Sequence, residues 1–431
     1  MRIIIYSYNY HPEPIGIAPL MTELAEGLVK QGHQVRVITG MPNYPQREIY
    51  QEYRGKWYMT EQKNGVTIQR SYLRIKSKPN LIDRLLLELS FVFTSLPQAL
   101  NGWQADVILL TVPPLLVSLP ATLLGWLHNC PVILNVQDIL PEAAVRMGLI
   151  KNKLMIRALR AIEQFAYRSA HTISVIADGF VENLVDKGVP SQKIVCIPNW
   201  VNVNFSRPLP KKSNPFRIAN QLQDKFVVLY SGNIALTQGL ETVIEAASRL
   251  RHIPQIVFVI AGEEKALKRL EAYCQKCGAD NVLLVPLMPR EKLPEMLAAA
   301  DVGLVVQKRN VISFNMPSKI PLLLASGRPI VASVPVSGTA ARAVRNSGGG
   351  IVVAPESPEA LAEGIVDLYH NRKKAAKLGY FGRLFAVEHY SFEQALAEYE
   401  ALFSEVVATS CESPSLGMLP KLTSSESIID I

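Results

Sequence analysis

The chain has 431 residues, and 48% of them are hydrophobic while 19% are charged. This composition is typical of folded globular proteins and argues against a disordered chain. A single hydrophobic core rarely serves more than about 250–300 residues, so the length predicts two domains. The formal net charge of +8 favours anionic partners. No dense run of Lys and Arg with interleaved aromatic residues is present, which argues against nucleic-acid binding.

The first half of the chain alternates predicted strands and helices. It opens with a strand at 2–7 and a helix at 18–31, in which Leu20, Leu24 and Leu28 form one apolar stripe. Further strands are predicted at 34–39, 106–112, 131–136, 171–176 and 194–197, with a helix at 178–187. Repeated strand–helix units predict a parallel sheet with helices on both faces.

Two segments of the first half have two interpretations each. Residues 107–127 carry no charge over the length of a membrane span, but three prolines and a division into a strand and a helix favour buried elements of an α/β domain. Residues 50–74 predict a small hairpin insertion, and residues 81–96 predict a strongly apolar helix. The helix follows four basic residues, Arg70, Arg74, Lys76 and Lys78. It therefore either lies on an anionic membrane surface or covers the first sheet.

The second half begins after residues 205–225, a segment rich in proline and lysine that predicts a linker. Strands are then predicted at 226–231, 256–261, 282–286, 302–306, 329–334 and 351–353. The predicted domains are 1–204 and 226–390, followed by a helix at 391–410 that could pack back on the first domain and a disordered tail at 411–431. The fold class is thus α/β, with two Rossmann-like parallel-sheet domains facing across a cleft. Ligands bind such sheets at the carboxyl ends of the strands.

Two glycine-bearing loops lie at those strand ends. The first, HPEPIGIA, places Gly16 just before a helix N-terminus, where phosphate is attracted. Taken alone, this loop is better explained as a tight turn between a strand and a helix. The second, YSGNIALTQG at 230–239, contains Gly232, Asn233, Gln238 and Gly239. Two such loops facing one crevice suggest a split site for a diphosphate.

Charged residues follow two other predicted strands. Lys308 and Arg309 end the strand at 302–306, and Ser318 and Lys319 open the next helix. These cations are either a solvated basic loop or a group that stabilises a diphosphate leaving group, and we favour the second. Asp138 either orients an acceptor hydroxyl or caps the helix that follows it. The histidines have no paired metal-ligand spacing, so no metal site is expected.

A family resemblance runs from the first strand to about residue 370. It is carried by YNYHPEPIGIA, GHQVRVITGMPNYP, VQDILPEAA, KIVCIPNW, VVLYSGNIALTQGLE, VVQKRNVISFNMPSK and LASGRPIVAS. In this order the segments resemble family 4 retaining glycosyltransferases of the GT-B fold, nearest to the colanic acid and exopolysaccharide fucosyltransferase type. The resemblance implies metal-independent hexosyl transfer, without a cofactor, from a nucleotide sugar to a lipid-linked or polysaccharide acceptor. It also implies a cytoplasmic protein, with peripheral contact with an anionic membrane left open.

The resemblance assigns roles to individual positions. Gly16 and the segment from Gly232 to Gly239 would face the donor phosphates, Glu263 would lie near the base and ribose, and Ser318 and Lys319 would contact the diphosphate or sugar. On the other side of the cleft, Asp138 would lie near the acceptor and Asn199 would support the crossover between the domains. His11 and Glu142 are placed on the acceptor side.

The sequence departs from the family pattern at two places. Many members have Arg and Lys where this chain has Asn233 and Gln238, so Lys308, Arg309 or Lys319 must meet the phosphate charge. The paired glutamates of the family are replaced by Phe314 and Leu322. Two other functions stay open: a nucleotide-sugar 2-epimerase, which needs more cleft carboxylates than Asp138 and Glu142, and a non-catalytic nucleotide-sugar-binding partner, which the lost glutamates favour.

Overall fold

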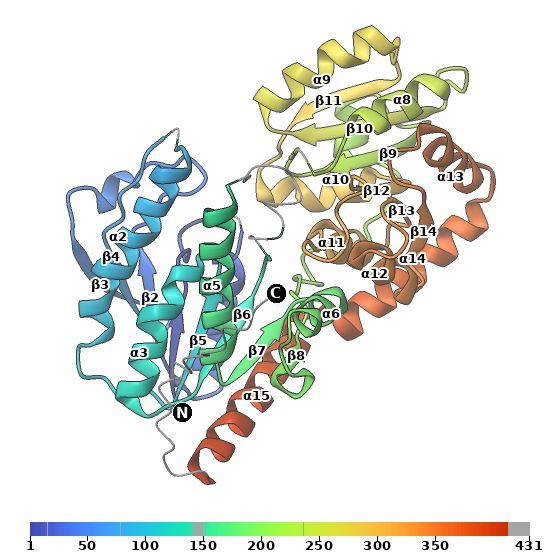
Figure 1. Cartoon of the computed structure of the whole chain (residues 1–431). Helices are drawn as coiled ribbons and strands as arrows, with labels where there is room; N and C mark the ends of the chain where they lie inside the picture. Colours follow the sequence, from blue (N-terminus) through green and yellow to red (C-terminus); the bar gives the residue numbers. More distant parts are fainter. Residues whose placement is uncertain are drawn as a thin grey trace, which may run out of the picture.

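The computed structural model describes residues 1–14, 16–77, 79–139, 142, 150, 152–235 and 237–412. These residues form two α/β domains with one sheet each, which stand apart as two lobes in Figure 1. The predicted fold class is confirmed.

The first domain is built on a sheet of order β3-β4-β2-β1-β5-β6-β7-β8. All neighbouring strands are parallel except β3 and β4. The strands are β1 (Arg2–Tyr6), β2 (Gln34–Gly40), β3 (Tyr58–Lys63), β4 (Val66–Ser71), β5 (Val107–Val112), β6 (Val132–Val136), β7 (Thr172–Val175) and β8 (Ile194–Cys196). The helices are α1 (Ala18–Lys30), α2 (Leu81–Ala99), α3 (Ser118–His128), α5 (Lys153–Ser169) and α6 (Asp178–Asp186), with short 3-10 turns η1 (Gln51–Tyr53), η2 (Leu115–Val117) and η3 (Ser191–Lys193).

The uncharged stretch at 107–127 forms β5, η2 and most of α3. Every residue of β5 is buried, because a central parallel strand is covered by helices on both faces. None of the helices that the structure describes is both long and apolar enough to cross a bilayer. The transmembrane interpretation of this stretch is wrong.

The hairpin predicted at 50–74 belongs to the sheet, because β4 pairs in parallel with β2 and β3 closes the edge. Arg70 is fully buried on β4 and forms an ion pair with Glu61. It therefore does not contribute to a basic surface beside α2, contrary to the prediction. Arg74 and Lys76 are exposed, and Lys78 lies outside the described residues.

The second domain has a fully parallel sheet of order β11-β10-β9-β12-β13-β14. Its strands are β9 (Phe226–Ser231), β10 (Ile256–Gly262), β11 (Val282–Pro286), β12 (Val302–Val306), β13 (Ile330–Ser333) and β14 (Gly350–Val353). Its helices are α7 (Pro215–Ala219), α8 (Glu241–Arg249), α9 (Glu264–Cys277), α10 (Leu293–Ala299), α11 (Lys319–Ala325), α12 (Thr339–Asn346), α13 (Pro358–His370) and α14 (Arg372–His389), with a 3-10 turn η4 (Arg290–Lys292).

The segment predicted as a linker is an ordered part of the second domain. It contains α7, and Phe216 and Leu222 lie in the core beneath the second sheet. Arg217 is buried and donates to the backbone carbonyl of Ala299 and, at 2.6 Å, to the carboxylate of Asp301. A composition rich in proline and lysine did not reveal these contacts, because they depend on residues about 80 positions away.

Helix α15 (Phe392–Glu412) connects the second domain back to the first. Tyr399 and Phe403 are buried in the core cluster that includes Leu24 and Leu28 of α1. Figure 1 shows α15, in red, lying along the first domain. The helix expected at 391–410 therefore packs on that domain. Residues 411 and 412, expected in the tail, end this helix, and residues 413–431 lie outside the described residues.

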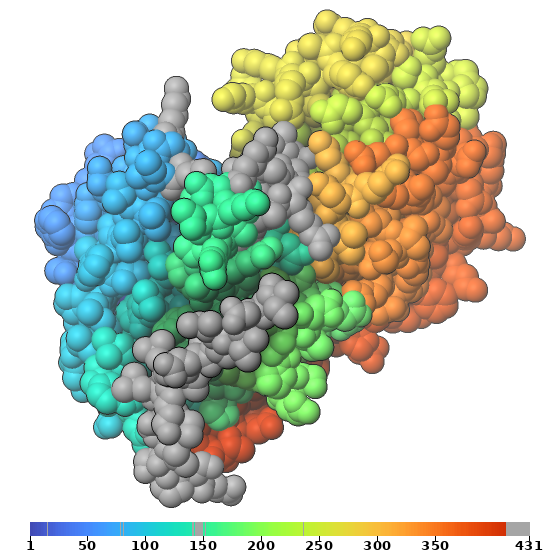
Figure 2. All heavy atoms as spheres, in the orientation of Figure 1, coloured from blue at the N-terminus to red at the C-terminus, as the bar shows by residue number. Residues whose placement is uncertain are grey.

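The two domains also meet directly. Glu182 on α6 forms an ion pair with Arg342 on α12, and the Asn183 amide donates to the Ser313 hydroxyl at 3.0 Å. Figure 2 shows a notch between the domains above this contact.

Candidate active site

The loop after β9 is shaped by two glycines. Gly232 has a φ of 125° and Gly239 a φ of 63°, backbone conformations that residues with a Cβ rarely adopt. The hydroxyl of Tyr230 donates to the carbonyl of Asn233 at 2.7 Å, and the backbone N–H of Ala235 donates to Oε1 of Gln238 at 2.5 Å. Gln238 therefore holds its own loop, and the Asn233 side chain is exposed.

Lys319 is the first residue of α11 and faces this loop. Its Nζ lies 3.6 Å from the centroid of the Tyr230 ring, and a Cβ added at Gly232 would lie 3.8 Å from that nitrogen. The ammonium is buried and has no hydrogen-bond partner within the described part of the chain. Burial lowers the pKa of Lys319 to about 7. An unpaired buried cation beside an open glycine loop is a group that an anionic ligand would stabilise.

Lys308 is the second basic residue that the structure brings to this loop. Its backbone N–H donates to the carbonyl of Thr237 at 2.8 Å. Its side chain covers Gly239, where a Cβ would come within 3.2 Å of Lys308 Cγ. Any side chain at position 239 would press on the lysine, so the glycine allows this close approach.

Three other predicted donor residues lie at the same sheet edge without such contacts. The Arg309 side chain is 77% exposed and is paired at 4.0 Å with Glu356, which follows β14. Ser318 occupies the N-cap position of α11, but its side chain forms no capping hydrogen bond. Glu263 directly follows β10 and is exposed. The structure thus joins Lys319 and Lys308 to the loop and leaves Arg309 outside that group.

Gly16 precedes α1 with a φ of 72° and open space around it. The preceding loop is anchored by Glu13, a residue that sequence reasoning passed over. Its carboxylate is buried and accepts hydrogen bonds from the backbone N–H groups of Asn43 and Tyr44, at 2.8 and 2.9 Å, and from the Asn9 amide at 2.6 Å. Burial raises the pKa of Glu13, and these donors oppose the rise. The glutamate therefore ties the loop after β1 to the loop after β2.

His11, predicted on the acceptor side, is turned toward the edge hairpin. Its Nε2 lies 2.8 Å from Nζ of Lys63 on β3, and its carbonyl accepts a hydrogen bond from Arg70. Burial and then the positive charge of Lys63 lower the pKa of His11. The structure brings this histidine to Lys63 and Arg70 and shows no contact between it and Asp138.

Asp138 follows β6 and faces the second domain. Its carboxylate accepts a hydrogen bond from the Asn315 amide, and burial raises its pKa to about 6. Asn315 in turn accepts a hydrogen bond from Gln307 at 3.0 Å. Because Gln307 immediately precedes Lys308, this chain of contacts links the predicted acceptor residue to the donor loop. Sequence reasoning missed Asn315, although it stands two residues before the Pro317-Ser318-Lys319 motif.

Glu142 and Asn199 have structural partners. The Glu142 carboxylate accepts from the Asn183 amide at 2.6 Å and lies 3.5 Å from Nζ of Lys187. The Asn199 amide donates to Oε1 of Gln137 at 2.6 Å and so connects the ends of β6 and β8. These contacts hold the first domain's edge together near the crossover.

Phe314 stands at the position of the first missing glutamate and has a packing role. Its side chain is 2% exposed and packs into the core cluster of the first domain, although it belongs to the second. Leu322 packs against the second core. An apolar side chain that joins the domains therefore stands where the family places an acid.

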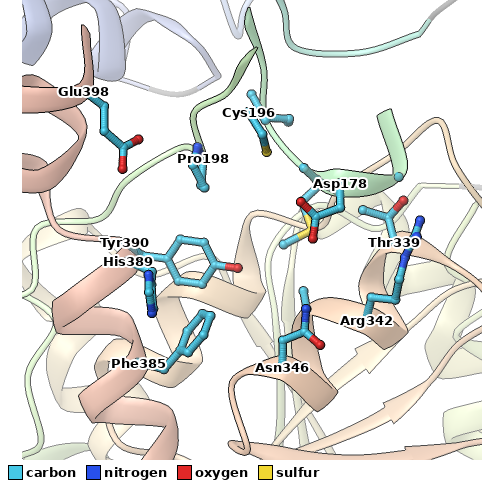
Figure 3. Close-up of a pocket in the computed structure, with 15 residues that line it drawn as sticks. Asp178, Cys196, Pro198, Thr339, Arg342, Asn346, Phe385, His389, Tyr390 and Glu398 are labelled. Carbon is cyan, nitrogen blue, oxygen red and sulfur yellow. The ribbon is translucent and has the colours of Figure 1, made fainter. Parts of the chain in front are cut away.

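A cavity of about 290 Å³ lies at the crossover between the domains. Figure 3 shows Asp178 and Cys196 of the first domain, Arg342 and Asn346 of α12, and Tyr390 between α14 and α15 around it. None of the predicted donor or acceptor residues lines this cavity. Among the described residues, no group of three or more His, Cys, Asp or Glu side chains could hold a metal ion.

The chain matches known families over both domains. Residues 16–200 match the family described as a glycosyl transferase 4-like domain, and residues 212–385 match glycosyl transferases group 1. The protein WcaI of Escherichia coli K12, named for glycosyl transfer in colanic acid biosynthesis, is 33% identical over 85% of this chain and 91% of its own length.

Solved structures support the same fold. Sucrose-phosphate synthase of Thermosynechococcus elongatus is similar with a TM-score of 0.72 at 18% identity, over 95% of this chain and 99% of that one. Anabaena HepE, whose crystal structure is a complex with UDP, is similar with a TM-score of 0.70 at 15% identity, over 94% of this chain and 100% of that one. The identity to WcaI and the matches in both domains lead to one conclusion: the chain belongs to family 4 of the GT-B glycosyltransferases.

Proposed function

We propose that this glycosyltransferase moves a sugar from a nucleotide-diphosphate donor to a lipid-linked or polysaccharide acceptor, with retention of anomeric configuration, in exopolysaccharide or cell-envelope synthesis. The similarity to WcaI supports the biological setting. The observation that carries the proposal is the buried, unpaired ammonium of Lys319 between Tyr230 and the glycine loop. The comparisons give no support to the epimerase or to the non-catalytic partner, although the lost glutamates favour the partner.

In the proposed reaction, the acceptor hydroxyl attacks the anomeric carbon on the face from which the diphosphate leaves. The bond from the anomeric carbon to the phosphate oxygen breaks as the new glycosidic bond forms, and the leaving phosphate takes the hydroxyl proton. Lys319 and Lys308 stabilise the charge that develops on the diphosphate, and Asp138 orients the attacking hydroxyl. The chain supplies no nucleophile in this scheme, so the missing glutamates do not prevent it, and it requires neither a cofactor nor a metal ion.

A thermal-shift panel of UDP-, GDP- and ADP-sugars tests donor binding. Ligand at about 100 times its dissociation constant should stabilise the protein by roughly 2.7 kcal/mol. Lys319→Ala should reduce both this shift and the rate of sugar transfer. Lys268→Ala is the control, because Lys268 is an exposed lysine on α9 that pairs with the exposed Glu264. The proposal is rejected if the protein transfers no sugar and Lys319→Ala binds nucleotide as well as the wild type does.

We also propose that the protein is cytoplasmic and contacts an anionic bilayer through the first domain. Helices α2, α3 and α5 lie together on one side of that domain (Figure 1). They expose a set of large apolar side chains: Ile82, Leu85, Phe93, Leu119, Leu123, Trp126, Leu127 and Leu154. Exposed basic residues accompany them: Arg74, Lys76, Arg84, Lys153, Arg157 and Arg160. Apolar anchors among cations are typical of proteins that bind the bilayer interface.

Vesicle sedimentation tests the bilayer contact. The wild type should bind vesicles that contain anionic phospholipid better than vesicles of phosphatidylcholine alone. Phe93→Glu and Trp126→Glu, at side chains 71% and 70% exposed, should each weaken binding. Tyr380→Glu is the control, because Tyr380 is 61% exposed on α14 of the second domain. Equal binding by all four proteins would refute the contact.

A further inference from the structure

Helix α2 extends past the carboxyl edge of the first sheet. It runs antiparallel to β4: the Gln98 side chain contacts the carbonyl of Arg70, Thr94 donates to the carbonyl of Tyr72, and Ser90 accepts from the N–H of Arg74. Its N-terminal turns therefore lie beside the loops that follow the strands, on the edge where ligands of parallel sheets bind.

One face of α2 packs on the end of β1. The Ser95 hydroxyl forms a hydrogen bond with the Tyr6 hydroxyl, and the Phe91 ring meets the rings of Tyr6 and Tyr8 edge to face, at centroid distances of 5.9 and 5.4 Å. Glu88 precedes Phe91 by three residues, so it occupies the same face one turn further toward the cleft. Burial and then the charge of Glu13 raise the pKa of Tyr8, and the charge of Glu88 adds a smaller part of that rise.

Glu88 has no partner that explains its position. It is half-buried, and no hydrogen bond or ion pair to it occurs within the described residues. Burial raises the pKa of its carboxyl to about 7. Two described basic residues are close to it in sequence: Lys76 pairs with Asp83 at 3.0 Å, and Arg84 is exposed. Glu13, in the adjacent loop, shows the contrast, because three donors satisfy its buried carboxylate.

Partial burial disfavours the ionised form of the Glu88 carboxylate, a cost that an apolar residue would avoid. The Glu88 oxygens are not among the fully buried, unpartnered atoms of the described residues, so this carboxylate stays open to a ligand. Its oxygens can be satisfied by hydroxyl groups of a bound ligand. The Tyr8 hydroxyl, which is hydrogen-bonded to Asn43, stands beside it as a second polar group. We propose that Glu88 and Tyr8 form a binding site for the acceptor, in which the Glu88 carboxylate accepts hydrogen bonds from hydroxyls of the acceptor saccharide. This inference rests on the proposed function, and it places the acceptor of the proposed reaction beside α2.

Saturation-transfer NMR with a panel of neutral methyl hexosides tests the site directly, because methyl hexosides lack the apolar tail that could bind the exposed helices. At least one member should bind the wild type. Glu88→Gln should weaken its binding about tenfold, the loss expected for a hydrogen bond to a charged group. Glu52→Gln, an exposed glutamate of the same domain, is the control and should bind as the wild type does. Binding of the donor in the thermal-shift panel should be unchanged in both variants.

The melting temperature of a Glu88 variant distinguishes a ligand-binding role of this residue from a structural one. Glu88→Leu should raise the melting temperature or leave it unchanged while hexoside binding is lost. The proposal is overturned if no hexoside binds, if Glu88→Gln binds as well as the wild type, or if Glu88→Leu lowers the melting temperature. A protein that binds nucleotide sugar but no hexoside would contradict this inference alone, whereas failure to bind nucleotide sugar would contradict the proposed function.

Discussion

The ionised carboxylate of Asp138, which the proposed reaction needs, destabilises the folded protein. Burial raises the pKa of its carboxyl from 3.8 to about 6, and the Asn315 amide offsets part of that rise. A carboxyl with a raised pKa favours the folded state below pH 3.8, and this contribution is lost as the pH rises to about 6. At neutral pH the ionised form therefore destabilises the fold, so stability alone does not explain why an aspartate stands here.

We expect Asp138→Asn to keep or raise the melting temperature at pH 7.5 and to lower the transfer rate by about 10²-fold, the loss expected when a reacting group is misplaced. The wild-type rate should also fall as the pH drops below about 6, because the protonated carboxyl is a weaker hydrogen-bond acceptor for the acceptor hydroxyl than the carboxylate is. Initial rates and melting curves from pH 5 to 8 measure both effects. A variant that is less stable and fully active would contradict this role.

Lys319 should make donor binding depend on pH. Burial holds the pKa of its ammonium at about 7 in the free protein, and a bound diphosphate would raise that pKa because an opposite charge favours the protonated form. Above pH 7, Lys319 is largely neutral in the free protein, so it takes up a proton when the diphosphate binds. We expect the affinity for nucleoside diphosphate to be highest below pH 7 and to fall as the pH rises from 7 to 9, by at most tenfold per unit.

Isothermal titration in two buffers of different ionisation enthalpy measures this proton uptake. Lys319→Met should bind more weakly at pH 7 and lose the part of the pH dependence that arises from this lysine. Equal proton uptake by the variant and the wild type would show that another group is responsible.

At the scale of elements, the strands and helices were accessible from the sequence because buried parallel strands are apolar runs with sharp ends. β9, β11 and β12 begin and end where they were predicted. Contacts between distant elements were not accessible. Arg70 was placed on a basic surface, yet its pairing with Glu61 depends on the register of β3 with β4. Likewise, the sequence located Lys319 but not the ring of Tyr230 beneath it.

The segment 205–225 is the element whose structural role differs most from its composition. Arg217 donates to the carbonyls of Leu222, Gln223 and Lys225 as well as to Ala299 and Asp301. Breaking a buried ion pair costs about 3–5 kcal/mol.

We therefore expect Arg217→Met to lower the melting temperature of the second domain by several degrees. Lys212→Met, an exposed lysine in the same segment, should change it little. Differential scanning calorimetry compares the two variants. Equal melting temperatures would mean that the segment behaves as a flexible linker after all.

At the scale of the whole molecule, the sequence predicted two facing domains but not how they are held together. The contacts come from residues with no motif of their own: Phe314 inserts into the first core, Glu182 pairs with Arg342, and α15 returns to the first sheet. Such contacts are specified by shape, which a single sequence does not display. The proposed reaction depends on them, because Asp138 and the glycine loop belong to different domains.

A substitution at Gly179 on α6 tests whether sugar transfer depends on the contacts between the two domains. A Cβ at this position would lie 2.0 Å from Oγ1 of Thr339 and 2.8 Å from a guanidinium nitrogen of Arg342, both on α12. These distances are below van der Waals contact, so we expect Gly179→Val to push α6 and α12 apart. The rate of sugar transfer should fall at least tenfold, because small misplacements of reacting groups have large effects. Binding of the nucleotide should change less than twofold, since Lys319, Lys308 and the glycine loop all belong to the second domain.

Small-angle scattering should show a larger radius of gyration for Gly179→Val than for Val185→Ile, a control at an exposed position of the same helix. If the valine variant transfers sugar at the wild-type rate while its domains are measurably further apart, then Asp138 need not approach the donor loop as closely as the proposed reaction requires. If it loses nucleotide binding as well, then the donor site depends on the first domain, and the two domains share the diphosphate in the way that the paired glycine loops first suggested.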